Sequence, residues 1–198
     1  EQNAYPGVSN RMTAKFADKV LLAVEDAKEH MPPSMDYAVT GNPVREDIIF
    51  ADRERARKAL GVGDRFCILT FGGSLGARRI NESVADLMAW HCGGDRIHHI
   101  HATGSYGVEL FPQLLQERGV QVEGNRHIDI REYIDNMAQC LAAADLVICR
   151  AGASTISELE AAGRASILIP SPNVAANHQY YNALVLAKRG AAILIEEK

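Results

Sequence analysis

The sequence predicts an α/β fold in which a parallel sheet carries helices on both faces. Two observations predict it: short apolar runs rich in β-branched residues recur along the chain, and stretches of helical periodicity separate most of them. Strands that alternate with helices in this way form parallel βαβ units. The strands are expected at 19–24, 37–40, 66–71, 97–102, 127–130, 146–149, 166–169 and 191–195. The helices are expected at 76–90, 108–118, 136–143, 154–162 and 178–189.

Length and composition limit the classes of protein to which the chain can belong. A chain of 198 residues, 47% of them hydrophobic, is long enough for one full domain and part of a second. The net charge of -4 argues against a basic nucleic-acid surface, so we expect no nucleic-acid partner. No apolar run reaches the roughly 18–20 residues needed to span a bilayer. The 4 cysteines form no CxxC pair, which predicts free thiols in a reducing cytoplasm rather than a disulfide framework or a zinc site.

Prolines and glycines mark one domain boundary. Met31-Pro32-Pro33-Ser34 and Gly41-Asn42-Pro43 interrupt the stretch before the second group of predicted elements, and two adjacent prolines stop a helix. We therefore expect residues 1–44 to be the end of one domain with its linker, and residues 45–198 to be most of a second domain. The abrupt start at Glu1 and the end just after an apolar run lead us to expect cuts in a longer protein.

A glycine-rich turn follows the strand predicted at 66–71 and opens the next helix. It reads Phe71-Gly72-Gly73-Ser74-Leu75-Gly76-Ala77. Glycines let the backbone approach a ligand, and the N–H groups and dipole at a helix N-terminus suit a phosphate, to which the Ser74 hydroxyl adds a donor. The turn has neither the Walker sequence nor the GxGxxG spacing, so a plain strand-to-helix turn is an equally good interpretation.

A second turn of small residues follows the strand predicted at 146–149. It reads Arg150-Ala151-Gly152-Ala153-Ser154-Thr155 and leads into a helix that carries Glu158. Its amides and hydroxyls suit a second group of phosphate oxygens, Arg150 is a planar charged donor, and the Glu158 carboxylate suits a ribose diol. Thr155-x-x-Glu158 also fits a capping box, in which Glu158 bonds only to the start of its own helix. Two such turns in one parallel sheet favour a diphosphate ligand.

A third polar segment, Asn177-His178-Gln179-Tyr180-Tyr181-Asn182, opens the last predicted helix. Gln and Asn side chains both donate and accept hydrogen bonds, as sugar hydroxyls and an acetamido group require. The alternative is a polar helix start capped by Asn177.

Histidines and aspartates do not predict a metal site. His99 and His101 are expected on one face of the strand at 97–102 and His98 on the other, with no acidic or cysteine ligand at metal spacing nearby. Asp129, Asp135 and Asp145 form no DxD element. We therefore expect neither a metal nor a cofactor.

Six segments, taken in order, resemble the MurG family of bacterial cell-wall glycosyltransferases, and the resemblance runs along essentially the whole chain. They are Glu1-Gln2-Asn3-Ala4-x-Pro6-Gly7-x-x-Asn10, Gly41-Asn42-Pro43-Val44-Arg45, Gly72-Gly73-Ser74-x-Gly76-Ala77-Arg78-x-x-Asn81, Tyr133-Ile134-Asp135-x-Met137, Cys149-Arg150-x-Gly152-Ala153-x-Thr155-x-x-Glu158 and Gln179-x-x-Asn182. Two positions depart from the family pattern: Leu75 replaces a common Gln, and His178 stands where some members have Gln.

The resemblance implies a GT-B fold, with two Rossmann-like domains facing across a cleft. Residues 1–44 would be a remnant of the N-terminal, acceptor-side domain, and residues 45–198 would be the C-terminal, UDP-GlcNAc-binding domain without its C-terminal helix. It implies UDP-GlcNAc and the lipid I acceptor as substrates. Ile134 and Met137 would border the uracil, and Glu158 would hold the ribose hydroxyls. The diphosphate would lie along Ser74, Ala153, Ser154 and Thr155, with Arg45 and Arg150 at its edge. Gln179 and Asn182 would contact the GlcNAc hydroxyls, and Glu1, Asn3 and Asn10 match the acceptor-side motif.

The reaction implied by the resemblance is inverting transfer of GlcNAc from UDP-GlcNAc to the MurNAc 4-hydroxyl, giving lipid II. A base deprotonates the acceptor, while helix N-termini rather than a metal stabilise the departing UDP. The base is not identifiable in this sequence and is expected in the preceding part, so the fragment alone is predicted to be inactive. The enzyme is expected at the cytoplasmic face of the plasma membrane, in peripheral contact with it.

Three other functions remain open from the sequence. A UDP-GlcNAc 2-epimerase has a similar two-domain fold, although it needs a cluster of acid/base carboxylates and histidines that is not evident here. Another GT-B glycosyltransferase would use the same turns on a different acceptor. A non-catalytic nucleotide-sugar-binding module is the alternative of a different class.

Overall fold

The computed structural model describes residues 1–197, which form two compact units. The first unit contains residues 1–45, 150–161 and the chain from 168 onward, and the second contains 46–149 and 162–167. Each unit combines separate stretches of the chain, so the units do not test the predicted domain boundary between residues 44 and 45, which stays a prediction.

The main sheet confirms the predicted α/β class. Six strands lie in the order β5-β4-β3-β6-β7-β8 and form a parallel sheet. Their bounds are β3 Phe66–Phe71, β4 Ile97–Ala102, β5 Ile128–Arg131, β6 Leu146–Cys149, β7 Ala165–Leu168 and β8 Ile193–Leu194. Counted from β3, this is the strand order 3-2-1-4-5-6 of a Rossmann sheet.

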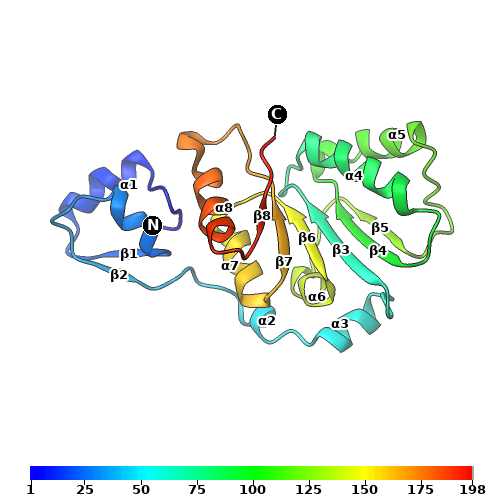
Figure 1. The fold of residues 1–198 in the computed structure, drawn as a ribbon, viewed down its shortest axis with the longest axis horizontal. Coiled ribbons are helices and arrows are strands. Elements are labelled where there is room, and N and C mark those ends of the chain that lie inside the picture. Colours follow the sequence, from blue (N-terminus) through cyan, green and yellow to red (C-terminus); the bar gives the residue numbers. More distant parts are fainter. Residues whose placement is uncertain (198) are drawn as a thin grey trace. The chain divides into compact units, whose positions relative to one another are not determined.

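In the second unit, helices cover both faces of the strands. The helices α4 (Arg78–His91) and α5 (Leu110–Glu117) lie on one side of β3, β4 and β5, and α3 (Arg53–Ala59) and α6 (Met137–Ala143) lie on the other (Figure 1). α4 turns Ile80, Val84, Ala85 and Met88 toward the core, at the spacing expected for one helical face. The short helices α2 (Glu46–Ile49) and η3 (Ser105–Gly107) complete the unit.

The first unit contains a small parallel pair of strands, β1 (Val20–Leu22) and β2 (Tyr37–Val39). Ala14, Leu22, Ala27 and Met31 form a buried cluster beside it. The helical segments before and between these strands are α1 (Val8–Thr13), η1 (Ala14–Phe16) and η2 (Glu25–His30). The helices α7 (Ala153–Ala162), η4 (Ala175–Asn177) and α8 (His178–Lys188) follow later in the chain.

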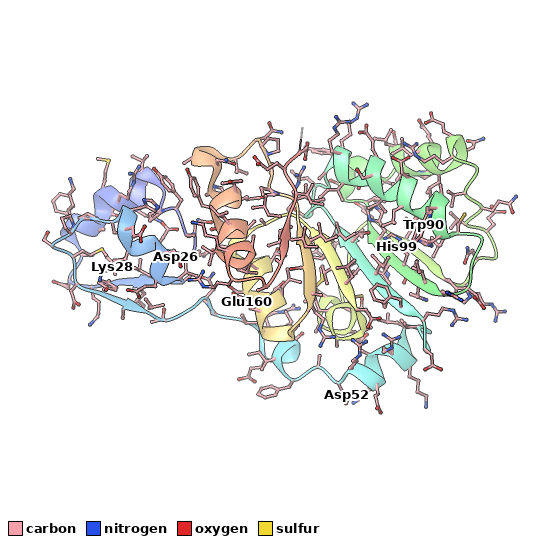
Figure 2. All side chains as sticks on the ribbon, in the orientation of Figure 1. Asp26, Lys28, Asp52, Trp90, His99 and Glu160 are labelled. Carbon is pink, nitrogen blue, oxygen red and sulfur yellow. The ribbon has the colours of Figure 1, made fainter. Side chains whose placement is uncertain are left out.

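The histidines of β4 lie as the alternation of the strand predicts. The Thr70 hydroxyl is 3.0 Å from His99 Nε2 and 2.7 Å from His101 Nδ1, so these two rings share one face. His99, labelled in Figure 2, also lies 2.9 Å from Nε2 of His91 on α4. Burial lowers the pKa of His101 to about 4 and holds that of His99 well below its ordinary value. These rings are therefore neutral and serve as core hydrogen-bonding groups.

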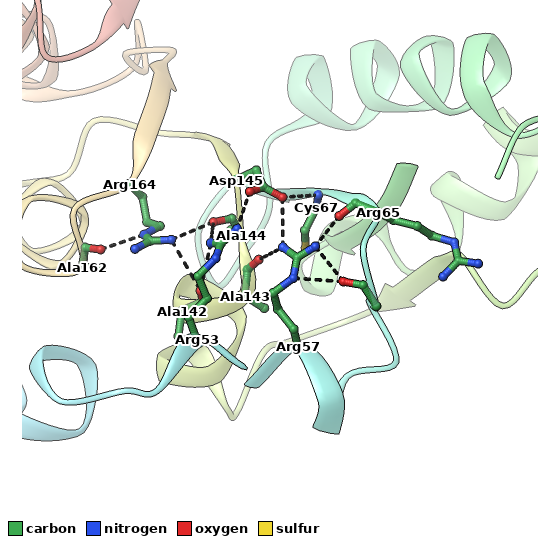
Figure 3. A network of polar contacts seen from close by, with 11 residues as sticks. Arg53, Arg57, Arg65, Cys67, Ala142, Ala143, Ala144, Asp145, Ala162 and Arg164 are labelled. Carbon is green, nitrogen blue, oxygen red and sulfur yellow. Dashed lines mark hydrogen bonds and ion pairs between the residues drawn. The ribbon is translucent and has the colours of Figure 1, made fainter. Parts of the chain in front are cut away.

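The carboxylate of Asp145, just before β6, joins its own segment to β3 and α3 of the second unit (Figure 3). It accepts hydrogen bonds from the Cys67 amide at 2.7 Å, from Arg57 Nη1 at 3.0 Å and from Arg53. Although burial opposes ionisation, these hydrogen bonds hold the pKa of Asp145 below its ordinary value. The same two arginines, with Arg164, also donate to carbonyl oxygens at the end of α6, those of Ala142, Ala143 and Ala144.

This network fixes where β3 and β6 begin relative to each other. The Asp145 amide donates to the Cys67 carbonyl at 2.8 Å, while the Asp145 side chain accepts from the Cys67 amide. Four positions further along, Phe71 and Cys149 are register partners, so both strands end at the same level. Burial raises the pKa of the Cys67 thiol to about 12, so that thiol stays protonated.

The predicted elements agree with the observed ones most closely in the middle of the chain. The bounds of β3, β4 and β6 were predicted to the residue, and those of α4 to α8 within two residues at each end. The short helices α2 and α3 were not predicted. Cys67, Cys92, Cys140 and Cys149 are free thiols, as the spacing indicated. Within residues 1–197, no helix is both long and apolar enough to cross a bilayer.

We expect Asp145→Asn to lower the free energy of unfolding by about 3 kcal/mol, because it leaves two partly buried guanidinium groups without their counter-charge. Asp86→Asn is the matched control, since Asp86 is 68% exposed and pairs with one arginine at the surface. That control should lose less than about 0.5 kcal/mol. Urea unfolding of both variants measures the difference, and equal losses would contradict the structural role of Asp145.

Candidate functional site

The point at which the strand order reverses lies between β3 and β6. In a sheet of this order, ligands bind outside the carboxyl ends of the strands at that reversal. The chain leaves β3 at Phe71 and β6 at Cys149, which are paired in register. The two turns that follow are the glycine-rich turn 72–77 and the turn 150–152, the segments that the sequence selected.

The glycine-rich turn is held from behind by a second loop of the same unit. Gly76 has φ +85°, and a Cβ on it would lie 2.2 Å from the carbonyl oxygen of Thr103. Gly104, with φ +70°, faces it so closely that its Cβ would lie 2.0 Å from the Gly76 nitrogen. The amides of Ser105 and Tyr106 donate to the carbonyls of Ser74 and Leu75, at 3.2 and 3.1 Å. Gly76 and Gly104 must be glycine because the backbones of the two loops pack directly against each other at these positions.

Only part of this turn is open to a ligand. Gly73 has φ +94° and nothing within 4 Å of the position that a Cβ would take. Ser74 beside it is exposed. The buried Asn81 side chain donates to the Thr103 carbonyl at 3.0 Å and so connects α4 to the supporting loop. Sequence reasoning missed Thr103 and Gly104, although a Thr-Gly pair directly after a predicted strand was a usable signal.

The turn after β6 passes into α7 at Ala153. Thr155 is therefore the third residue of the helix and not its N-cap, so Thr155 and Glu158 do not stand in capping-box positions. Ser154 is exposed, while Ala153, Thr155 and Glu158 are half-buried, with Glu158 in the second turn of the helix. The first-turn amides of a helix of this length have no intrahelical acceptor and suit an anion.

Arg150 is engaged within the protein. Its Nη1 donates to the carbonyls of Ile169 and Pro170 at 3.2 and 3.1 Å, and lies 2.6 Å from Glu197 Oε2. Its side chain is 14% exposed. The guanidinium therefore joins the start of the turn to the end of β7 and to the last part of the chain.

The chain enters α8 through two residues in the left-handed region. Ala176 and Asn177 have φ +53° and +51°, a conformation that costs a non-glycine residue about 1–2 kcal/mol. Asn177 occupies the N-cap position, but its side chain makes no capping hydrogen bond, so the predicted alternative of an Asn cap is wrong. On the helix, Gln179 is half-buried and accepts from the Ser171 amide at 2.9 Å, and Asn182 is buried.

The three acceptor-side residues lie together. Glu1 Oε1 accepts from the Asn3 amide at 2.8 Å, and Glu1 Oε2 accepts from Asn10 Nδ2 at 2.6 Å. Burial opposes its ionisation, but these hydrogen bonds lower the pKa of the Glu1 carboxyl. The cluster is therefore an ordered carboxylate and two amides.

The remaining predicted residues lie in separate segments. Ile134 is 4% exposed in the loop after β5, and Met137 is the half-buried first residue of α6. Arg45 is exposed in the segment between β2 and α2.

The family model described as "Glycosyltransferase family 28 C-terminal domain" matches residues 67–198. The chain is 43% identical to the "UDP-N-acetylglucosamine--N-acetylmuramyl-(pentapeptide) pyrophosphoryl-undecaprenol N-acetylglucosamine transferase" of Desulforamulus reducens, and 44% identical to the protein of that name from Acetivibrio thermocellus. Each match covers 100% of this chain and 53% of the relative, so the chain spans about half the length of these relatives.

Among solved structures, the chain resembles a MurG from Acinetobacter baumannii. The TM-score is 0.74 at 30% sequence identity, and the match covers 99% of this chain and 52% of that one. The likeness therefore includes both the fold and part of the sequence.

We expect Gly104→Ala to lower the free energy of unfolding by about 3 kcal/mol or more, because its Cβ would collide with backbone atoms of Gly76 that have no room to move. Gly119→Ala is the matched control: its φ is +68° and nothing lies within 4 Å of its added Cβ. It should lose only the cost of the backbone conformation, about 1 kcal/mol. Thermal unfolding compares the two, and similar losses would argue against the close approach of the two loops.

Proposed function

The chain belongs to the glycosyltransferase family 28 C-terminal domain family, and from that membership we propose that it is the donor-binding part of an inverting GlcNAc transferase. The proposed reaction moves GlcNAc from UDP-GlcNAc to the 4-hydroxyl of MurNAc in lipid I and yields lipid II for peptidoglycan synthesis. The names of relatives at 43% and 44% identity support this substrate pair. Because the chain spans about half of their length, the complete reaction is proposed for the full-length protein.

The observation that carries the proposal is the turn between β6 and α7. Small residues at Gly152 and Ala153 keep the turn open, and the N-terminus of α7 stands at the carboxyl end of a strand beside the reversal of strand order. Such a helix start offers main-chain N–H groups and a positive dipole end to an anion. A diphosphate is the part of UDP-GlcNAc that needs this environment.

The proposed contacts follow the ligand from base to sugar. Ile134 and Met137 border the uracil, and Glu158 accepts hydrogen bonds from the ribose hydroxyls. Ser74, Ala153, Ser154 and Thr155 bind the diphosphate, with Arg45 and Arg150 at its edge. The GlcNAc hydroxyls contact Gln179 and Asn182. The acceptor side is formed by Glu1, Asn3 and Asn10.

No metal is part of the proposed mechanism. The carboxylates of Asp129 and Asp145 are each paired with arginine, Asp129 with Arg131 Nη2 at 2.6 Å, so their charges are already balanced within the protein. Main-chain dipoles at helix N-termini take the role of stabilising the departing UDP. The base that deprotonates the acceptor hydroxyl is proposed to lie in the full-length protein outside this chain.

The proposed place of action is the cytoplasmic face of the bacterial plasma membrane. The support is chemical: the acceptor named in the relatives is a lipid-linked pyrophosphate, and the enzyme must reach it at the membrane surface. Peripheral contact is therefore proposed. The UDP-GlcNAc 2-epimerase alternative is not favoured, since the relatives at 43% and 44% identity carry the transferase name.

A transfer assay tests the proposed function. The full-length protein is supplied with UDP-GlcNAc and a short-chain lipid I analogue, in the presence of EDTA. The expected result is the disaccharide product together with one equivalent of UDP. Failure to form the product, with free UDP-ManNAc appearing instead, would overturn the transferase in favour of an epimerase.

We expect Glu158→Ala to weaken UDP binding by about tenfold to a hundredfold, because a hydrogen bond to a charged group contributes about 1.5–3 kcal/mol. Titration calorimetry with UDP measures the change. Glu160→Ala is the control, since Glu160 lies two positions along the same helix and has no proposed contact with the donor (Figure 2). An unchanged UDP affinity in Glu158→Ala, with only about 1 kcal/mol of stability lost, would leave Glu158 a structural residue.

A further inference from the structure

The side chain of Asn182 hydrogen-bonds to two other segments of the first unit. Its Oδ1 accepts from the Ala4 amide at 2.8 Å, and its Nδ2 donates to Asn3 Oδ1 at 2.9 Å and to the Ala151 carbonyl at 3.3 Å. The residue is 5% exposed. Both amide hydrogens and one acceptor position of Asn182 are thus used inside the protein.

Glu1 orients the partner of Asn182. The Asn3 side chain donates through Nδ2 to Glu1 Oε1 at 3.2 Å, and the Asn3 amide donates to the same oxygen. Because the Nδ2 end faces Glu1, the Oδ1 end of Asn3 is turned toward Asn182. We call the segment Glu1–Tyr5 the strap.

A ring stack fixes the strap beside this hydrogen bond. Tyr5 stacks on Tyr181 with the ring centroids 4.8 Å apart and the planes 23° from parallel, and Tyr5 also lies 4.6 Å from the His30 ring. The strap and α8 thus make two neighbouring contacts: the hydrogen bond from Ala4 to Asn182 and the ring stack of Tyr5 on Tyr181. Offset aromatic pairs of this kind favour a fixed arrangement.

The third hydrogen bond connects the strap to the phosphate-facing turn. Ala151 lies between Arg150 and Gly152 in the turn after β6 and is fully buried, and its carbonyl accepts the hydrogen bond from Asn182. Asn182 also borders a pocket with Gln2 and Ala4 of the strap and with Ala153 and Ser157 of α7. Gln179, one helical turn earlier, uses its oxygen to cap the Ser171 amide and has no hydrogen bond to the strap or to Ala151 among those described for residues 1–197.

We propose that Asn182 is a positioning residue that fixes the acceptor-side strap and the Ala151 turn against each other. This rests on the proposed function for the identity of the ligand, and it assigns Asn182 a role beyond contact with the sugar. Loss of its side chain frees the backbone of the turn that receives the diphosphate. Binding of UDP, which has no sugar, should therefore weaken together with binding of UDP-GlcNAc.

The test compares UDP and UDP-GlcNAc affinities of the full-length protein by titration calorimetry. In Asn182→Ala, both ligands should bind about tenfold more weakly, by a similar factor. In the matched control Gln179→Ala, UDP-GlcNAc affinity should fall while UDP affinity stays unchanged. Loss of UDP-GlcNAc affinity alone in Asn182→Ala would overturn the positioning role and leave a direct sugar contact.

A second measurement does not depend on the ligand. Hydrogen exchange of the Ala4 amide should be slow in the wild type and faster in Asn182→Ala. Asn182→Asp keeps an acceptor for the Ala4 amide but loses both donors. That variant should keep exchange at Ala4 slow and still weaken UDP binding. Asn3→Ala combined with Asn182→Ala should be no weaker for UDP than Asn182→Ala alone. Fast Ala4 exchange in the wild type, or additive losses, would overturn the coupling. If the wild type bound neither ligand, the proposed function would fall, and Ala4 exchange would still decide the coupling.

Discussion

The hydrogen bonds of the Asp145 carboxylate fix where β3 and β6 begin relative to each other, and the rest of the second unit depends on them. The carboxylate accepts hydrogen bonds from the amide of Cys67, the second residue of β3, and from two arginines of α3, and Asp145 is the residue just before β6. A shift of one residue in the pairing register would turn every side chain of a strand to the other face of the sheet. With the start fixed, β3 and β6 end at the same level, at Phe71 and Cys149.

Most arginines near these strands are used to bind the protein itself. Arg53, Arg57 and Arg164 satisfy carbonyl groups at the end of α6, where a helix leaves its last acceptors without partners. Arg150 does the same for the end of β7. The chain thus offers a phosphate main-chain N–H groups at a helix start more readily than mobile cationic side chains. This arrangement suits the proposed binding of a diphosphate and release of UDP, because a dense cluster of cations would hold the product.

Local patterns predicted the parts of the fold that local forces determine. β3 and β6 are largely apolar runs, and β4 combines apolar residues with three buried histidines. Short runs of this kind between turn residues are typical of strands in a parallel sheet, so their bounds could be read from the sequence. α3 is charged on most of its surface, and its two arginines bind a partner 92 and 88 positions away, which no local pattern shows. The capping alternative for Glu158 failed because α7 begins two residues before Thr155, among small residues without a strong start signal. Glu1, Asn3 and Asn10 were selected from the sequence, but the link from Asn3 to Asn182 spans 179 positions and needed the fold.

In the proposed function, the turn between β6 and α7 receives the phosphates of the donor. Addition of UDP to the isotope-labelled chain, followed through its backbone amide resonances, tests that claim most directly. We expect concentration-dependent shifts at the amides from Gly152 to Thr155, with the amides of β1 and β2 unchanged. Saturable shifts elsewhere with the Gly152–Thr155 amides unmoved would contradict it.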